Sequence, residues 1–204
     1  MHVTLIGTGN MARGLGSRVL AGGHDLTVVG KDEQRAEAVA ADLGGQGRVG
    51  TAVDGDPIEG EVVVLAVYYP DARAAVEQYA DQLAGKVVVD ITNPVNATFD
   101  GLVVPPDGSA TNELAGLAPD ARFVKAFNTT FAGPLTQGEV DGQTLDVLIA
   151  GDDDDPRPRS PRWPATAVST PSTSARKRGR GNSRRRACFT WESRTRSEPA
   201  SRAP

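Results

Sequence analysis

A glycine-rich turn near the start of the chain has the spacing of a diphosphate-binding loop. The strand-like segment 2–6 leads into a G-x-G-x-x-A pattern at residues 7–12. Between a strand and a helix, the first glycine permits the tight turn, and the second lets a pyrophosphate approach the backbone. The helix N-terminus favours the anion through its unpaired N–H groups and its dipole. The alternative is a tight turn without a ligand. The expected dinucleotide contacts are Gly7, Thr8, Gly9, Asn10 and Met11.

The end of the next apolar run indicates which dinucleotide fits. Run 26–29 ends at Gly30, and no carboxylate stands at its tip. In an NAD site, an Asp or Glu at this position holds the ribose 2′-hydroxyl. Lys31 follows directly and Arg35 comes one helical turn later, and cations suit the 2′-phosphate of NADP. We expect Lys31 and Arg35 to favour NADP over NAD. Two observations oppose this: Asp32 and Glu33, directly after Lys31, could repel the phosphate, and both cations fit an ordinary solvated helix surface.

Three later apolar runs deliver polar or aromatic residues to one edge of the expected sheet. In a doubly wound sheet, ligands bind beyond the carboxyl ends of the strands. Run 61–67 ends at Tyr68 and Tyr69, of which one is expected to pack beneath the next helix. For Asn93, a turn-forming Asn-Pro pair is an equally good interpretation. The further expected cofactor contacts are Ala66, Val67, Tyr68, Asn93 and Pro94, and the expected substrate contacts are Asn128, Thr129 and Thr130.

Strand-like and helix-like segments alternate through residues 1–155. Continuous apolar runs are typical of strands covered on both faces of a parallel sheet. The expected strands are 2–6, 26–29, 48–51, 61–67, 86–91, 122–127 and 144–150, and the expected helices are 10–20, 31–43, 71–83 and 109–117. We expect Ser109 or Thr111 to cap the last helix. The alternation predicts an α/β fold with a Rossmann-like, doubly wound, mostly parallel sheet.

Charge divides the chain into two parts. Residues 1–155 carry 9 Lys and Arg against 24 Asp and Glu, whereas residues 156–204 carry 13 against 2. The first part is long enough for one domain with its own core. The second has one branched aliphatic residue, Val168, and cannot bury enough apolar area to offset its ordering entropy. We expect an NADP-binding Rossmann domain at 1–155 and a disordered, low-complexity basic tail at 156–204.

The basic tail allows two further interpretations. Its arginine clusters at 176–180 and 184–186 are of a kind that binds nucleic acid, but we expect no nucleic-acid partner. Residues 181–193 can be written back into DNA with GC-rich codons where possible. When that DNA is translated in a shifted frame, starting at the third base of each codon, it can encode an amphipathic segment rich in Glu, Ala and Leu. We hypothesise that the reading frame slips near Pro156, so that the tail is translated out of frame. Stop codons throughout the shifted frame of the gene would reject this hypothesis.

The residue inventory offers little for other kinds of chemistry. The single cysteine, Cys188, lies in the tail, so no disulfide framework or cysteine metal site is expected. The two histidines, His2 and His24, flank secondary-structure elements, and we expect no catalytic residue and no metal. No apolar run reaches transmembrane length, and the first strand leaves no room for a signal peptide. We expect a cytoplasmic protein that binds small-molecule cofactors and has no membrane partner.

Five segments in this order and spacing resemble the F420-dependent NADP oxidoreductase family (NADPH:F420 reductases). They are Gly7–Ala12, Val28–Lys31, Thr92–Pro94, Lys125–Thr129 and Ile149–Asp154. The resemblance implies hydride exchange between NADP(H) and coenzyme F420, with the cofactors supplying the chemistry and the protein the orientation. Related reductase domains, including the cytosolic domain of membrane metalloreductases, share the fourth segment. The alternatives are an NADPH-dependent reductase of another acceptor, such as a flavin, and a non-catalytic NADP-binding module.

The resemblance also implies roles for single residues. Thr8, Asn10 and Met11 would line the phosphates, and Lys31 and Arg35 would hold the 2′-phosphate. In the family, a C-terminal helical region helps to form the deazaflavin pocket and the homodimer, and this chain departs from the pattern there. The residues that would face the reacting rings are Tyr68, Tyr69, Pro70, Asn93, Asn128, Thr129 and Thr130.

Overall fold

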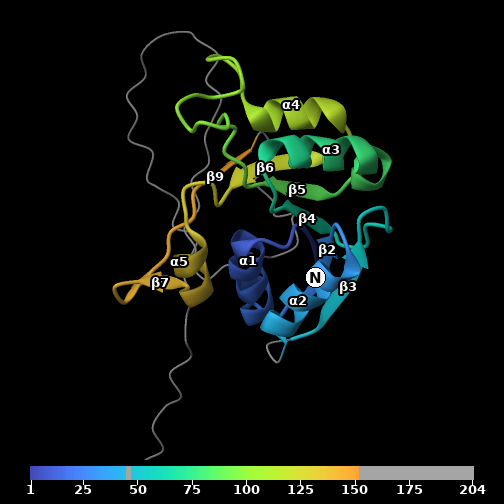
Figure 1. Ribbon diagram of the computed structural model, residues 1–204, viewed down its shortest axis with the longest axis vertical. Helices are drawn as coiled ribbons and strands as arrows, with labels where there is room; N and C mark the ends of the chain where they lie inside the picture. The colour runs from blue at the N-terminus through green and yellow to red at the C-terminus, as the bar shows by residue number, and fades with distance from the viewer. Residues whose placement is uncertain (45–46, 152–204) are drawn as a thin grey trace, which may run out of the picture.

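A mostly parallel sheet runs through the part of the chain that the computed structural model describes, residues 1–44 and 47–151. Within these residues the strand order is β3-β2-β1-β4-β5-β6-β9, and all neighbours are parallel except β6 and β9 (Figure 1). The order reverses between β1 and β4, which confirms the expected Rossmann-like fold, and doubly wound sheets bind ligands at such a reversal. The strands are β1 His2–Ile6, β2 Asp25–Gly30, β3 Val49–Val53, β4 Val62–Leu65, β5 Val87–Asp90, β6 Arg122–Ala126 and β9 Ile149–Gly151.

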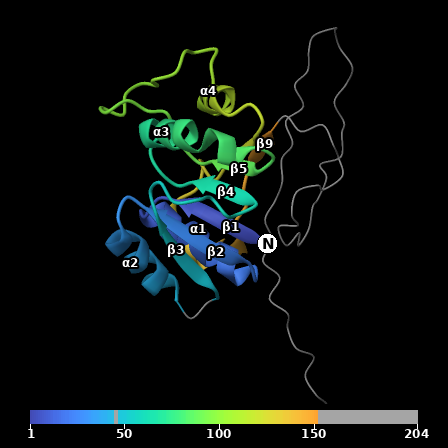
Figure 2. The same ribbon diagram turned by 90° about the vertical axis from the view of Figure 1, so that its right-hand side faces the viewer.

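Helices cover both faces of this sheet, and each face encloses its own apolar cluster. One face carries α1 (Asn10–Ala21), α2 (Glu33–Leu43) and α5 (Ala132–Gln137). The other carries α3 (Tyr69–Tyr79), a 3₁₀ turn (Ala80–Leu83) and α4 (Ala110–Leu117). Figure 1 shows α3 and α4 side by side, away from α1 and α2, and Figure 2 shows the same separation from a direction turned by 90°.

The central strands are buried on both sides, as their continuous apolar runs predicted. Every residue of β4 is buried. Val62 and Val64 belong to the cluster beneath α1 and α2, whereas Val63 and Leu65 belong to the cluster beneath α3 and α4. Alternate residues of a strand point to opposite faces, so β4 needs apolar side chains at every position. This double burial holds the central strands in place, and their carboxyl ends form the edge at which doubly wound sheets bind ligands.

Two helices start two residues away from the expected position. The helix expected at 31–43 starts at Glu33, because Asp32 is its N-cap and accepts a hydrogen bond from the Arg35 backbone N–H at 2.9 Å. The helix expected at 71–83 starts at Tyr69, since Pro70 fits the first helical turn, and it continues as a 3₁₀ turn from Ala80. Both differences lie at the carboxyl edge of the sheet. There, the residues that begin the helix, rather than apolar periodicity, decide where it starts.

The region after β6 differs most from the expectation. The strand expected at 144–150 is two short strands: β8 (Gln143–Thr144), which forms a hairpin with β7 (Glu139–Val140), and β9, which pairs antiparallel with β6. Helix α5 was not expected, and it contains Gly133 and Pro134, which are poor helix formers. It forms because it packs on α1 at close range. A Cβ at Gly14 would lie 2.9 Å from the Ala132 carbonyl oxygen and 3.0 Å from Leu135 Cβ.

Two buried tyrosines make the stability of the fold depend on pH in the alkaline range. The Tyr69 hydroxyl donates to Glu113 Oε2 at 2.5 Å, and the Tyr79 hydroxyl donates to Asp54 Oδ1 at 3.1 Å. Burial, helped by these carboxylates, raises the pKa of Tyr69 and the pKa of Tyr79. An acid whose pKa is raised by folding stabilises the fold fully below its unfolded pKa, about 10 for tyrosine, and this stabilisation is lost as the pH rises through the folded pKa.

We therefore expect the free energy of unfolding to fall from about pH 10 upward. Ultraviolet titration of tyrosinate should show groups that ionise later in the folded protein than in denaturant. Tyr69→Phe and Tyr79→Phe should each remove one such late group. Identical titration curves for the folded and the denatured protein would contradict this expectation.

Three expectations concern residues that lie outside those described. They are the basic tail at 156–204, its boundary at residue 155 and the reading-frame hypothesis.

Candidate functional site

The glycine turn after β1 fits tightly against the neighbouring strand. Gly7 has φ +125°, and a Cβ on it would lie 2.3 Å from the Ala66 carbonyl oxygen. Its backbone N–H donates to the Val29 carbonyl at 2.9 Å. Ala66 is buried, and Val67 Cγ1 would lie 3.0 Å from the same Cβ. Position 7 therefore requires glycine for structural reasons, and Ala66 and Val67 form the wall of the turn.

The second glycine opens onto free space. Gly9 is the N-cap of α1, and a Cβ there would meet no atom within 4 Å. Among the described residues no side chain caps α1, and its first turn carries no acidic residue. The first-turn N–H groups of a helix have no intrahelical acceptor, so this end is available to an anion. Asn10 is exposed, whereas the partly buried Met11 side chain packs against the core.

A groove of about 390 Å³ lies beside this turn, lined by Thr8, Gly9, Arg13, Arg35 and Ala38. Arg13 donates through Nη1 to the Thr8 carbonyl at 2.8 Å and pairs through Nε with Asp42 Oδ2 at 2.7 Å. The groove therefore has an open helix N-terminus at one side and two guanidinium groups along its walls. Sequence reasoning missed Arg13, although a cation shortly after a glycine-rich loop was visible in the sequence.

The two cations expected to favour NADP are differently placed. Arg35 lines the groove, and its Nε pairs with Asp32 Oδ2 at 3.1 Å. Lys31 is not among the groove residues, and it pairs with Asp71 Oδ1, on the first turn of α3, at 3.2 Å. Both pairs are exposed, so each contributes at most about 1 kcal/mol and can exchange its carboxylate for a phosphate. Asp32, which raised the prospect of repulsion, is engaged as the cap of α2.

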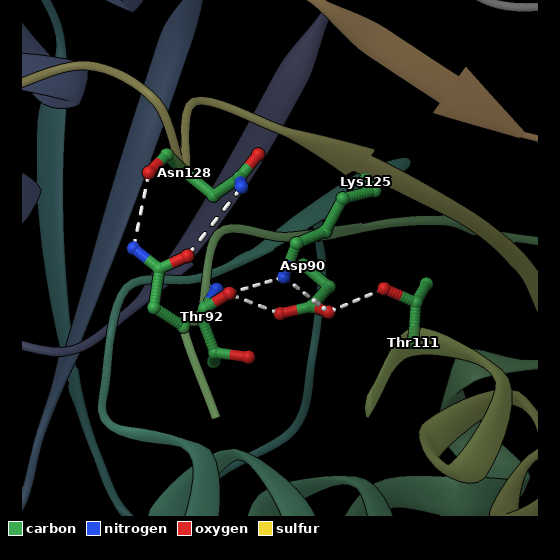
Figure 3. A network of polar contacts seen from close by, with 6 residues as sticks. Asp90, Thr92, Thr111, Lys125 and Asn128 are labelled. Atoms are coloured by element: carbon green, nitrogen blue, oxygen red, sulfur yellow. Dashed lines mark hydrogen bonds and ion pairs between the residues drawn. The ribbon is translucent and has the colours of Figure 1, made fainter. Parts of the chain in front are cut away.

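A polar network holds the carboxyl ends of β5 and β6 together (Figure 3). Asp90 is fully buried and pairs through Oδ2 with Lys125 Nζ at 2.9 Å, directly across the strand register. The Thr111 hydroxyl donates to the same oxygen at 2.7 Å, and the Thr92 N–H donates to Oδ1 at 2.8 Å. Lys125 Nζ also donates to the Thr92 carbonyl. Sequence reasoning missed this role of Asp90 and took Thr111 for a possible helix cap, a position that Ser109 occupies without a side-chain hydrogen bond.

Beside this network, two asparagines meet at the sheet edge. Asn93 Nδ2 donates to the Asn128 carbonyl at 3.0 Å, and Asn128 Nδ2 donates to Asn93 Oδ1 at 3.4 Å (Figure 3). Asn128 follows Phe127, whose φ of +61° is rare for a bulky residue. Phe127 is buried in the cluster beneath α1, and that packing holds the turn. The structure thus brings together two residues that are 35 positions apart and were expected at one site.

The remaining expected residues line the same edge with different exposure. Tyr68 is 76% exposed at the N-cap of α3, whereas Tyr69, the first residue of α3, is buried in the cluster that includes α4, which confirms that one of the two tyrosines packs in the core. Pro94 is half-buried, and its carbonyl accepts from the Val103 N–H at 2.8 Å. Thr129 is exposed and Thr130 is half-buried. The edge therefore offers an exposed aromatic ring, that of Tyr68, and the hydroxyls of two threonines.

Two other kinds of site can be assessed within the described residues. No group of three or more His, Cys, Asp or Glu side chains there is arranged to hold a metal ion. None of the helices described is long and apolar enough to cross a membrane.

Residues 2–94, which contain the glycine turn and the Thr92–Pro94 segment, match the family model described as NADP oxidoreductase coenzyme F420-dependent. Over these residues the chain is similar to that family. The family similarity and the Rossmann-like fold agree with each other. The Asn128–Thr130 loop lies beyond the matched residues.

Relatives with assigned activities extend the similarity over about three quarters of the chain. The F420-dependent NADP reductase of Methanocaldococcus jannaschii is 28% identical over 175 residues, which cover 76% of this chain and 74% of that protein. The metalloreductase STEAP3 of Rattus norvegicus is 32% identical over 150 residues, which cover 74% of this chain but only 29% of that protein. Among solved structures, a hypothetical protein from Sinorhizobium meliloti has a TM-score of 0.67 at 25% identity, covering 76% of this chain and 75% of its own. A candidate F420-dependent NADP reductase from Arthrobacter sp. FB24 has a TM-score of 0.63 at 25% identity, with 74% of each chain covered.

Proposed function

We propose that residues 1–151 bind NADP(H) along the edge formed by β1, β2, β4 and β5. The observation that carries the proposal is the uncapped N-terminus of α1, which opens onto a groove lined by Arg13 and Arg35. A diphosphate would accept hydrogen bonds from the backbone around Gly9, and a 2′-phosphate would lie among the guanidinium groups. The match of residues 2–94 to an NADP-dependent family supports this assignment.

We further propose that the nicotinamide end lies at the Asn93 and Asn128 pair. These side chains offer amide donors and acceptors without a formal charge, which suits a carboxamide and a ring that changes charge during the reaction. The Asp90 and Lys125 pair beside them joins the ends of the two strands. NADP(H) bound in this way would supply or accept a hydride, while the protein orients the two rings and keeps them in contact.

The acceptor that we favour is coenzyme F420, so that the activity is hydride exchange between NADP(H) and F420. The similarity to archaeal F420-dependent NADP reductases over most of the chain supports it. A second candidate is an NADPH-dependent reductase of another acceptor, such as a flavin or a metal complex, and the similarity to a metalloreductase favours that candidate. A module that binds NADP without turnover is the third.

Acceptor assays separate these candidates. We expect the purified full chain, mixed with NADPH and F420, to consume F420 absorbance at a rate that depends on protein concentration. The same assay with a flavin or a metal complex in place of F420 gives the control. Reduction of the flavin or the metal complex alone would exclude the F420 assignment in favour of the second candidate. Binding of NADPH without any reduction would leave only the binding module.

A further inference from the structure

We infer that Arg13 is a direct ligand of the NADP 2′-phosphate and, with Arg35, sets the preference for NADP over NAD. This inference rests on the proposed function and names residues that distinguish the two cofactors at that site. Arg13 and Arg35 stand on different helices, α1 and α2, and both line the groove beside Gly9. Lys31, the cation next to the strand tip, is directed instead to Asp71 on α3.

The geometry of Arg13 supports a role in recognition. Its guanidinium bridges the glycine turn and α2, because it donates to the Thr8 carbonyl at 2.8 Å and pairs with Asp42 at 2.7 Å. One edge of the group is therefore fixed against the turn that would hold the diphosphate. The Arg13 side chain is 35% exposed and its Asp42 partner is 57% exposed, so water reaches the pair and screens it.

The strand tip offers no competing site for an NAD ribose. A Cβ at Gly30 would lie 2.8 Å from the Asp32 carbonyl oxygen and 3.0 Å from the Ala36 nitrogen, so an acidic side chain has no room at that position. Asp32 is the nearest carboxylate in the sequence, and it is bound to the Arg35 backbone N–H and the Arg35 guanidinium. The groove thus has two cations that can bind an anion. The end of β2 at Gly30 has no room for the acidic side chain that binds the ribose hydroxyls in NAD sites.

Dissociation constants for NADPH and NADH, measured by fluorescence titration of the full chain and its variants, test the inference. We expect Arg13→Gln and Arg35→Gln each to weaken NADPH about 10- to 100-fold and NADH less than about threefold, because only NADPH carries the phosphate. Arg13→Lys should recover part of the loss, since a cation is restored without the planar fork. Arg48→Gln is the matched control, because Arg48 pairs with Asp25 at the opposite end of β2.

The outcomes separate this inference from the proposed function. An equal loss of NADPH and NADH affinity in Arg13→Gln would overturn it, because Arg13 would then support the turn through Thr8 rather than bind the phosphate. A larger loss of NADPH affinity in Lys31→Gln than in Arg13→Gln would overturn it as well. If the unaltered chain binds neither nucleotide, the proposed function itself fails. Binding of 2′,5′-ADP but not 5′-ADP by the unaltered chain, abolished in Arg13→Gln, would support the inference independently of the nicotinamide.

Discussion

Gly9→Val should reduce NADPH affinity by a factor of about 100 or more while leaving the protein folded. A diphosphate kept off the α1 N-terminus loses at least two charged hydrogen bonds, each worth about 1.5–3 kcal/mol, and a loss of about 3 kcal/mol already exceeds 100-fold. The variant should fold because Gly9 has φ −81° and ψ −174°, which valine adopts, and because a Cβ there meets no protein atom within 4 Å. Fluorescence titration with NADPH, together with the thermal midpoint, measures both effects.

Valine substitutions at two other glycines serve as controls for Gly9→Val. A Cβ at Gly116 in α4 would also meet no atom within 4 Å, so Gly116→Val should fold and bind NADPH normally. Gly7→Val should fail to fold properly, because its Cβ would collide with the Ala66 carbonyl oxygen. Normal NADPH binding by a folded Gly9→Val protein would show that the diphosphate does not lie on this turn.

Lys125→Met should destabilise the fold by about 3–5 kcal/mol, because it leaves the Asp90 carboxylate buried without its cation. Asp90 is fully buried, and the Lys125 side chain is 22% exposed. Methionine keeps most of the lysine stem, so the loss reports the charge rather than the packing. The total stability of a domain is about 5–15 kcal/mol, so this one substitution would remove a large share of it. Chemical denaturation followed by circular dichroism measures the change.

The matched control for Lys125→Met is Arg48→Met. Arg48 pairs with Asp25 at 2.7 Å, but its side chain is 85% exposed, and removal of such a pair should cost at most about 1 kcal/mol. The double variant Asp90→Asn with Lys125→Met should recover part of the loss, since no buried charge remains. Equal and small losses for Lys125→Met and Arg48→Met would mean that the Asp90 network does not hold the strand ends together.

The sequence predicted the first half of the fold well because local and tertiary signals agree there. The runs at β4 and β5 are buried at nearly every position, as a doubly covered parallel strand requires, and the glycine turn has one compatible conformation at Gly7. The region after β6 could not be predicted in the same way. Helix α5 depends on its contact with Gly14 across the chain, and Phe127 takes a left-handed conformation that only its burial explains.

The candidate site shows the same division. Residues that act through the backbone, such as Gly7 and Gly9, follow from motif spacing. Residues that act through long side chains do not, since their direction depends on neighbours that are distant in sequence. Arg13 reaches Asp42, and Lys125 reaches Asp90, across 29 and 35 positions. The pairing of Asn93 with Asn128 was anticipated only as a shared sheet edge, and its hydrogen bonds needed the structure.

A crystal structure of the full chain grown with NADP⁺ tests the central claim most directly. We expect a diphosphate within hydrogen-bond distance of the backbone N–H groups at residues 9–11, with the 2′-phosphate between Arg13 and Arg35. A nucleotide that binds elsewhere on the protein, while the first turn remains in contact with solvent alone, would contradict it.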